Sequence, residues 1–171
     1  MIFVTVGTNE APFDRLVRAV DRLPADEEVV VQCGPSSHRP ARAVRVDFLA
    51  FEELVELVRR ARVVVTHAGA GSTMVALANG KRPVVVPRLR RYREAVDDHQ
   101  LPFARRLAER GLVTLIEDPA GLPETLAAVR DGAVEASVVP DERLVEDLRR
   151  SIDAALTGSR ANENATVYRR G

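Results

Sequence analysis

The sequence predicts a doubly wound α/β fold, in which one parallel sheet carries helices on both faces. Short apolar runs alternate with helical segments along the chain, and turn residues separate them. Most of these apolar runs are continuous and do not alternate with polar residues. Regular strand–helix alternation is typical of parallel sheets, and continuous apolar strands are typical of sheets that are covered on both faces.

Six apolar runs are expected to form the strands. The first, Ile2-Phe3-Val4-Thr5-Val6, ends at Gly7, and the second ends at Gly34-Pro35. Pro87 ends the fifth run. Glycine and proline end strands because they favour turns and weaken the backbone ladder. The expected strands cover residues 2–6, 29–33, 43–48, 63–66, 83–86 and 112–116.

The segments between these runs have helical spacing. Phe13, Leu16, Val17 and Val20 fall on one helical face, and Pro24 closes that helix. Further helices are expected over residues 51–60, 73–79, 97–110, 122–130 and 141–156. Residues 157–171 are polar and lack periodicity, so we expect a disordered or partner-docking tail after a single domain over residues 1–156.

Composition narrows the possible functions. The 171 residues are 46% apolar and 29% charged, as expected for a soluble globular domain. The 25 basic and 25 acidic side chains cancel, aromatics are only 4%, and Trp is absent, so the sequence indicates no nucleic-acid partner. The single cysteine, Cys33, is expected to be a small buried side chain in a reducing compartment. The first apolar run is expected to be a strand and not a signal peptide, and no run approaches a membrane span, so we expect a cytoplasmic protein.

Two glycine turns are expected to face the same crevice. In a sheet of order 3-2-1-4-5-6, strands 1 and 4 are neighbours and ligands bind at their carboxyl ends. The first strand ends in Gly7-Thr8, and the fourth ends in a glycine-rich turn before a helix. Such a turn offers backbone N–H groups to a phosphate, and Gly69 and Gly71 are expected to allow positive φ and close approach of a ligand. The expected cradle is Gly69, Ala70, Gly71, Ser72 and Thr73, with Ser72 or Thr73 as a helix cap.

A dinucleotide is one alternative ligand for this turn. However, the third glycine of the dinucleotide fingerprint would fall on Met74. The turn also follows the fourth strand instead of the first, and the next strand ends in Pro87-Arg88 without an acidic residue for a ribose hydroxyl. These misfits argue against NAD. A tight turn without any ligand is the other alternative.

Four segments together resemble the C-terminal domain of family 28 glycosyltransferases, above all its short stand-alone subunits. These segments are residues 3–8, 66–72, 78–87 and 97–100, and the resemblance covers about residues 1–113. It implies a Rossmann-like, donor-binding half of a GT-B enzyme that transfers a sugar from a UDP-sugar, with inversion, to a lipid-linked acceptor. It also implies a membrane-associated partner subunit that supplies the acceptor half, which would place the chain at the membrane periphery.

The resemblance also implies roles for single residues. The diphosphate would lie at the cradle, with Gly7 and Thr8 on the opposite wall. Phe48 matches a position that meets the uracil, although a core aromatic is an equal alternative. His67, one candidate catalytic residue, matches a histidine that approaches the diphosphate; its alternative is a structural histidine that holds the loop through a bond to the backbone.

The second candidate catalytic residue is His99. With Gln100 it matches a pair that reads the hydroxyls of the donor sugar, and the alternative is a solvent-exposed helix start. Val75 stands where many relatives carry a ribose-binding Glu, which weakens the assignment of UDP. Four arginines, Arg88, Arg90, Arg91 and Arg93, are expected in a loop beside the crevice, either simply solvated or attracting anions.

Neither a metal nor a cofactor is expected, because the sequence has no Asp-x-Asp motif near the site. The donor sugar nucleotide is then a substrate. Two other functions stay open at this point. One is a non-catalytic subunit that binds a nucleotide sugar and regulates its partner, and the other is a protein related to UDP-sugar 2-epimerases.

Overall fold

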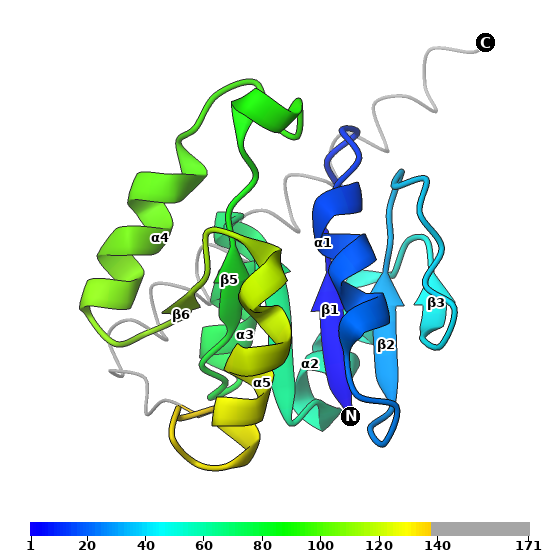
Figure 1. Cartoon of the computed structure of the whole chain (residues 1–171). Coiled ribbons are helices and arrows are strands. Elements are labelled where there is room, and N and C mark those ends of the chain that lie inside the picture. Colours follow the sequence, from blue (N-terminus) through cyan, green and yellow to red (C-terminus); the bar gives the residue numbers. More distant parts are fainter. Residues whose placement is uncertain (138–171) are drawn as a thin grey trace, which may run out of the picture. The chain divides into compact units, whose positions relative to one another are not determined.

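The computed structural model describes residues 1–137, and within them six strands form one parallel sheet (Figure 1). The strands are β1 (Ile2–Thr5), β2 (Val29–Gln32), β3 (Val44–Val46), β4 (Val63–His67), β5 (Val84–Val86) and β6 (Thr114–Leu115). Their order across the sheet is β3-β2-β1-β4-β5-β6. This order confirms the predicted doubly wound sheet and places β1 beside β4. The helix predicted over 141–156 and the tail over 157–171 lie outside the described residues.

The helices lie between the strands, as predicted, but several begin or end elsewhere. They are α1 (Asp14–Ala19) with the 3₁₀ turn η1 (Val20–Arg22), α2 (Phe51–Arg60), α3 (Ala70–Ala78), the turn η2 (Arg90–Tyr92), α4 (Gln100–Glu109), the turn η3 (Pro119–Gly121) and α5 (Leu122–Arg130). The predicted helix start at Thr73 is wrong, because the N–H of Thr73 already donates to the carbonyl of Gly69 at 3.1 Å. The predicted start at Asp97 is also wrong, since α4 begins at Gln100.

Side chains from the two faces of the sheet enter different clusters. Val84 and Val86 pack in the cluster that contains the buried residues of α1 and α5, whereas Val85 packs against α4. In Figure 1, α1 and α5 lie in front of the sheet and α2 and α3 behind it. Because β1, β2 and β5 are buried along their whole length, their sequences are apolar at successive positions. The edge strand β3 is more open, and Val44 is 56% exposed.

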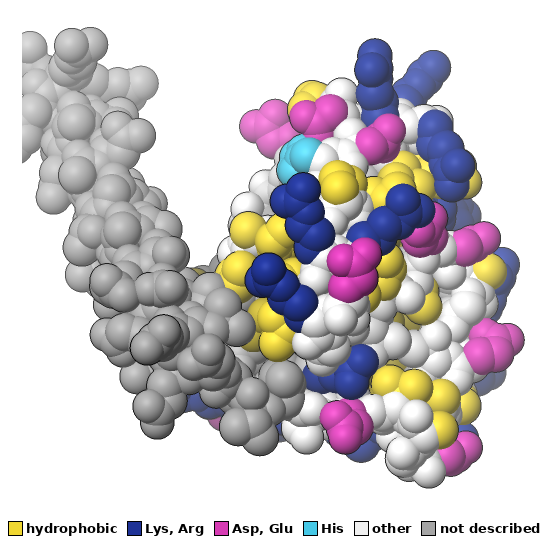
Figure 2. Space-filling view, turned by 90° about the vertical axis from the view of Figure 1, so that its left-hand side faces the viewer, with side chains coloured by type: hydrophobic (Ala, Val, Ile, Leu, Met, Phe, Trp, Pro, Cys, Tyr) yellow, Lys and Arg dark blue, Asp and Glu magenta, His cyan; other side chains and the backbone are white. Residues whose placement is uncertain are grey.

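The surface carries both signs of charge. On the side of the molecule where α4 lies, Lys and Arg side chains stand among acidic and hydrophobic ones (Figure 2). This mixture agrees with the zero formal net charge of the chain. Among the described helices, none has the length and apolar character needed to cross a membrane.

Candidate functional site

The imidazole of His67 fills the space between the two glycine turns. Strands β1 and β4 run side by side, with Thr5 paired to Thr66, so the turns that follow them are adjacent. A Cβ atom added at Gly7 would lie 2.3 Å from Cε1 of His67, and one added at Gly69 would lie 2.1 Å from Nε2. Both distances are far below a normal contact. The ring is therefore held between two backbone segments that can tolerate only glycine.

The glycines of this site differ in what they contribute. Gly7 has a φ of +75°, which few other residues adopt easily. Positive φ was predicted for Gly69 and Gly71 and is wrong for both, because Gly69 has a φ of −79° and Gly71 lies in the first turn of α3. A Cβ at Gly71 would meet nothing within 4 Å. Protein packing does not require glycine there, which leaves open space over the start of α3.

The start of α3 presents unpaired backbone donors to this space. The first four N–H groups of a helix, here those of Gly69, Ala70, Gly71 and Ser72, have no partner within the helix. Ala70 and Gly71 are exposed. Thr73 was expected to supply a fifth donor, but its N–H is used by the carbonyl of Gly69. The four donors and the positive end of the helix dipole favour an anion at this point.

Neither Ser72 nor Thr73 caps α3, contrary to the prediction. Gly69 is the N-cap residue, and no side chain bonds the first N–H groups. The Ser72 hydroxyl instead accepts a hydrogen bond from the hydroxyl of Thr66 at 2.8 Å. The Thr73 hydroxyl is buried and has no hydrogen-bond partner within residues 1–137. The donors at the start of α3 are consequently not covered by a capping side chain.

His67 is neutral at physiological pH. Burial, followed by the nearby positive charge of Arg88, lowers the pKa of His67 to about 4. Its Nδ1 lies 3.4 Å from the Ser72 hydroxyl and 3.5 Å from the Thr66 hydroxyl. The predicted alternative, a ring held by a bond to the backbone, has no such bond among the described contacts. A neutral imidazole can offer one N–H to an anion while its other nitrogen faces a hydroxyl.

The turn after β1, opposite the start of α3, is held in place by a buried pair of side chains. The Thr5 hydroxyl donates to Oε1 of Gln32 at 2.5 Å, and the Gly7 N–H donates to the Thr5 hydroxyl at 3.1 Å. Thr8 follows Gly7 and is exposed. The turn after β1 therefore has a defined conformation, and the side chain of Thr8 stands outside it, in solvent.

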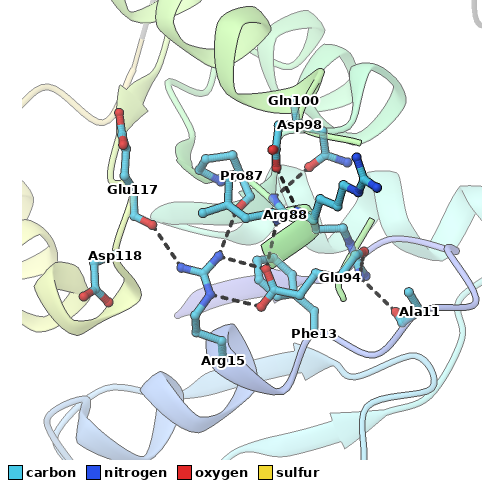
Figure 3. Close-up of polar contacts among 12 residues, drawn as sticks. Ala11, Phe13, Arg15, Pro87, Arg88, Glu94, Asp98, Gln100, Glu117 and Asp118 are labelled. Carbon is cyan, nitrogen blue, oxygen red and sulfur yellow. Dashed lines mark hydrogen bonds and ion pairs between the residues drawn. The ribbon is translucent and has the colours of Figure 1, made fainter. Parts of the chain in front are cut away.

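Arg88 is the main structural residue that sequence reasoning misplaced (Figure 3). It was expected in an exposed loop, but its side chain is 0% exposed. Its guanidinium donates to the carbonyl oxygens of Val6 at 2.8 Å, Ala11 at 2.9 Å and Glu94 at 3.1 Å. It also stacks on the Phe13 ring, 4.7 Å from the ring centroid. Burial lowers the pKa of Arg88 to about 10, so it is still charged at neutral pH.

A second arginine fixes the same loop from the side of α1. Arg15 donates through Nε and a terminal nitrogen to both carboxylate oxygens of Glu94, at 3.0 and 2.9 Å. It also donates to the carbonyl of Pro87 at 2.9 Å. Oε2 of Glu94 also accepts the N–H of Leu89 at 3.1 Å. Arg88 thus joins the loop after β1 to the loop after β5, and Arg15 joins α1 to the loop after β5. The sequence signal that could have revealed Arg88 is its position two residues after the wholly buried strand β5.

The two residues at the start of α4 lie in different environments. Gln100 is buried, and its Oε1 accepts the backbone N–H of Arg88 at 3.0 Å. His99 is exposed and its ring contacts the carboxylate of Asp97. The hydrogen bond from the His99 backbone, followed by that from its ring, lowers the pKa of Asp97. The predicted roles of both residues toward a donor sugar stay predictions.

Two residues expected near the nucleoside are also placed. Phe48 is 64% exposed, so the alternative of a core aromatic is wrong. It lies beyond the carboxyl end of β3, at the same edge of the sheet as the glycine turns. Val75 is buried in α3.

Cys33 is buried as predicted, and burial raises the pKa of its thiol. Within residues 1–137, no three His, Cys, Asp or Glu side chains are grouped to hold a metal ion.

A six-stranded parallel sheet of this order, with its ligand edge between β1 and β4, is a Rossmann-like fold, and its structural neighbours are GT-B glycosyltransferases. The calicheamicin glycosyltransferase CalG4 superposes on 98% of this chain with a TM-score of 0.58 and 22% identity, and the chain covers 42% of it. At that identity the likeness shows the fold alone. The chain belongs to glycosyltransferase family 28, because the model of the family's C-terminal domain matches residues 1–141.

Two curated relatives show what kinds of protein contain this domain. The human UDP-N-acetylglucosamine transferase subunit ALG13 is 32% identical over 123 residues, which are 64% of this chain and 10% of that protein. The UDP-N-acetylglucosamine–N-acetylmuramyl-(pentapeptide) pyrophosphoryl-undecaprenol N-acetylglucosamine transferase of Ralstonia nicotianae is 29% identical over 166 residues, or 86% of this chain and 44% of that enzyme. The chain thus spans less than half the length of either relative.

Proposed function

We propose that this chain is the donor-binding, catalytic subunit of an inverting glycosyltransferase that uses a UDP-sugar. The observation that carries the proposal is the open start of α3, where four backbone N–H groups lack a helical partner and the ring of His67 lies against both Gly69 and Gly7. This arrangement suits a diphosphate. Both curated relatives are named as N-acetylglucosamine transferases, and one is named as acting with UDP-N-acetylglucosamine on a pyrophosphoryl lipid.

In the proposed reaction, a hydroxyl oxygen of the acceptor attacks the anomeric carbon of the donor sugar. The bond from that carbon to the diphosphate oxygen breaks, and UDP departs with the electron pair. The N–H groups of Ala70, Gly71 and Ser72 and the neutral ring of His67 stabilise the charge that grows on the diphosphate. The hydroxyl proton passes to a base that we assign to the acceptor half of the enzyme. His99 and Gln100 read the sugar hydroxyls, and Phe48 meets the uracil.

We further propose that the acceptor is lipid-linked and that a membrane-associated partner subunit supplies the acceptor half. The relative from human cells is named as a subunit, and the Ralstonia relative is named for a lipid acceptor. The domain described here provides one Rossmann-like unit, whereas a GT-B active site lies between two. The chain would then work in the cytoplasm, at the membrane, through that partner.

Calorimetric titration of the chain with UDP, GDP and NAD tests the donor. UDP is expected to bind more tightly than either competitor. Gly71→Ala is expected to weaken UDP binding at least about tenfold, because the new methyl group occupies the open space over the N–H donors. Gly121→Ala, at another position where a Cβ meets nothing within 4 Å and φ is negative, serves as the control. Tighter binding of NAD than of UDP would contradict the proposal.

A turnover assay distinguishes a catalytic subunit from a regulatory one. The chain together with its acceptor-half partner is expected to release UDP from a UDP-sugar only when a lipid-linked acceptor is present. UDP binding without any transfer by the complete pair would favour the non-catalytic, regulatory alternative. Formation of a 2-epimeric sugar by the chain alone would favour the epimerase alternative.

A further inference from the structure

A groove of about 450 Å³ lies beside the donor crevice, between the loop after β1 and the loop after β5. It is lined by Asn9, Ala11, Arg90, Arg93, Ala95 and Val96. Asn9 and Ala11 belong to the same short loop as Gly7 and Thr8, which form one wall of the donor site. A molecule bound in the groove would therefore lie next to a nucleotide sugar bound at the start of α3.

Two exposed arginines line the groove. Arg90 and Arg93 are exposed, and neither forms a salt bridge within residues 1–137. Two unpaired guanidinium groups in one groove repel each other, and an anion between them relieves that repulsion.

Several acidic residues lie near the groove, and one of them is held by other groups. Glu94 is buried and its two oxygens are held by Arg15 and by the N–H of Leu89. Asp98 accepts the backbone N–H of Arg90 at 2.8 Å. Glu10 is exposed on the facing loop and is the acid that an incoming anion would have to avoid. Asp97 is a further exposed acid of this loop, and its pKa is lowered first by the hydrogen bonds from His99 and also by the charge of Arg90.

The backbone of the groove is both rigid and unusual. Arg88 bonds to the carbonyls of Ala11 and Glu94, so the two walls are joined through one buried guanidinium. Arg93 has a φ of 58° and is the only non-glycine residue within residues 1–137 with a positive φ. Left-handed backbone favours Gly or Asn over Arg, and residues held in it concentrate at functional sites.

The lining of the groove is partly apolar. Val96 is 88% exposed, the highest value among the large exposed hydrophobic residues, and Ala95 and Ala11 also line the groove. Tyr92, on the same loop, is 50% exposed. Arginine forks bind phosphate oxygens, and exposed apolar side chains gain free energy when hydrocarbon covers them. The groove thus combines partners for a phosphate and for a hydrocarbon chain.

We propose that this groove binds the diphosphate of the lipid-linked acceptor, with Arg90 and Arg93 on its phosphate oxygens and Val96 against the first carbons of the lipid. This inference rests on the proposed function and assigns part of the acceptor site to the donor-binding subunit. An anion between the two arginines would hold the acceptor sugar beside the donor sugar.

Calorimetry on the full chain saturated with UDP tests the groove, with farnesyl diphosphate below its micellar concentration as the probe. Farnesyl diphosphate is expected to bind without displacing UDP, and at least tenfold more tightly than inorganic pyrophosphate. Arg90→Gln combined with Arg93→Asn is expected to weaken the binding of farnesyl diphosphate at least tenfold and to change UDP binding less than twofold. Asn is chosen at position 93 because it tolerates positive φ. Arg60→Gln combined with Arg110→Gln, two exposed arginines at helix ends, is the matched control.

Each other outcome overturns the inference. Displacement of UDP by the probe would place the probe in the donor crevice. Equal binding of pyrophosphate would show a free-phosphate site without a role for Val96, and binding to phosphatidylglycerol vesicles alone would show a general membrane surface. No binding of the probe while UDP still binds would leave the proposed function standing and place the diphosphate on the partner. Loss of UDP binding with the probe still bound would instead contradict the proposed function.

Discussion

At the scale of single residues, the site depends on one histidine and the small residues around it. Gly7 and Gly69 must be glycine, because a Cβ atom at either position would lie within 2.3 Å of an atom in the His67 ring. Gly71 is different, because only a ligand would contact a side chain there. The same short segment therefore contains glycines required by the fold and one glycine that the fold does not require.

Substitution of these glycines separates stability from binding. Gly7→Ala is expected to lower the free energy of unfolding by at least about 2 kcal/mol, because it adds both a clash with His67 and an unfavourable positive φ. Gly71→Ala is expected to leave the free energy of unfolding unchanged or raise it by up to about 1 kcal/mol, since alanine favours helix. Urea denaturation of both variants checks this, and equal losses would contradict the assignment.

The protonation of His67 is expected to make stability depend on pH. Its folded pKa is about 4, below the value of 6.5 for an unfolded histidine, so the unfolded chain binds the extra proton first as the pH falls. The contribution of His67 is complete above about pH 7, falls between about pH 6.5 and 4, and amounts to roughly 3 kcal/mol at most.

Denaturation of the wild type and of His67→Gln at pH 7.5 and 5.0 measures this difference. The wild type is expected to lose more stability than the variant between the two values. An NMR titration that placed the pKa of His67 near 6.5 would contradict the buried, neutral ring.

At the scale of elements, two loops act as one unit. Arg88 bonds to main-chain carbonyls of both the loop after β1 and the loop after β5, and Arg15 of α1 bonds to Pro87 and Glu94 in the second loop (Figure 3). The β4–α3 turn has no such bonds to Arg88 or Arg15 and is instead held by the packing of His67. The walls of the crevice are thus fixed by side chains from distant parts of the sequence.

Removal of Arg88 is expected to loosen both loops together. Arg88→Met leaves the carbonyls of Val6, Ala11 and Glu94 without their donor, which is expected to cost at least about 3 kcal/mol. Hydrogen exchange is expected to accelerate over residues 7–13 and 89–96 and not in the middle of β4. Arg91→Met, at an exposed position, is the control and should change stability by less than about 0.5 kcal/mol. Faster exchange in only one loop would show that Arg88 does not couple them.

At the scale of the described domain, all the proposed ligand contacts lie at one edge of the sheet. The turns after β1 and β4, the loop after β5 and Phe48 after β3 follow the carboxyl ends of parallel strands. The opposite edge contains the ends of α2 and α4 and no proposed site residue. This polarity follows from the parallel order, in which every strand points the same way.

Nucleotide binding should therefore protect one edge of the sheet from hydrogen exchange and stabilise the whole domain against unfolding. UDP at 100 times its dissociation constant is expected to raise the free energy of unfolding by about 2.7 kcal/mol. Thermal denaturation with and without UDP measures the overall effect. Hydrogen exchange is expected to slow over residues 7–12 and 67–73, and protection confined to the amino-terminal ends of the strands would contradict the site.

The sequence by itself determined the fold class, the order of strands and helices, the family and the place of the two glycine turns. It could do so because burial on both faces of a parallel sheet leaves continuous apolar strands, and because glycine is required where backbone approaches closely. Only the tertiary structure decided that Arg88 is buried, that Phe48 is exposed and that Gln100 bonds to the Arg88 backbone. These facts depend on contacts between residues far apart in the chain, such as Arg88 with Val6, which no local pattern of spacing records.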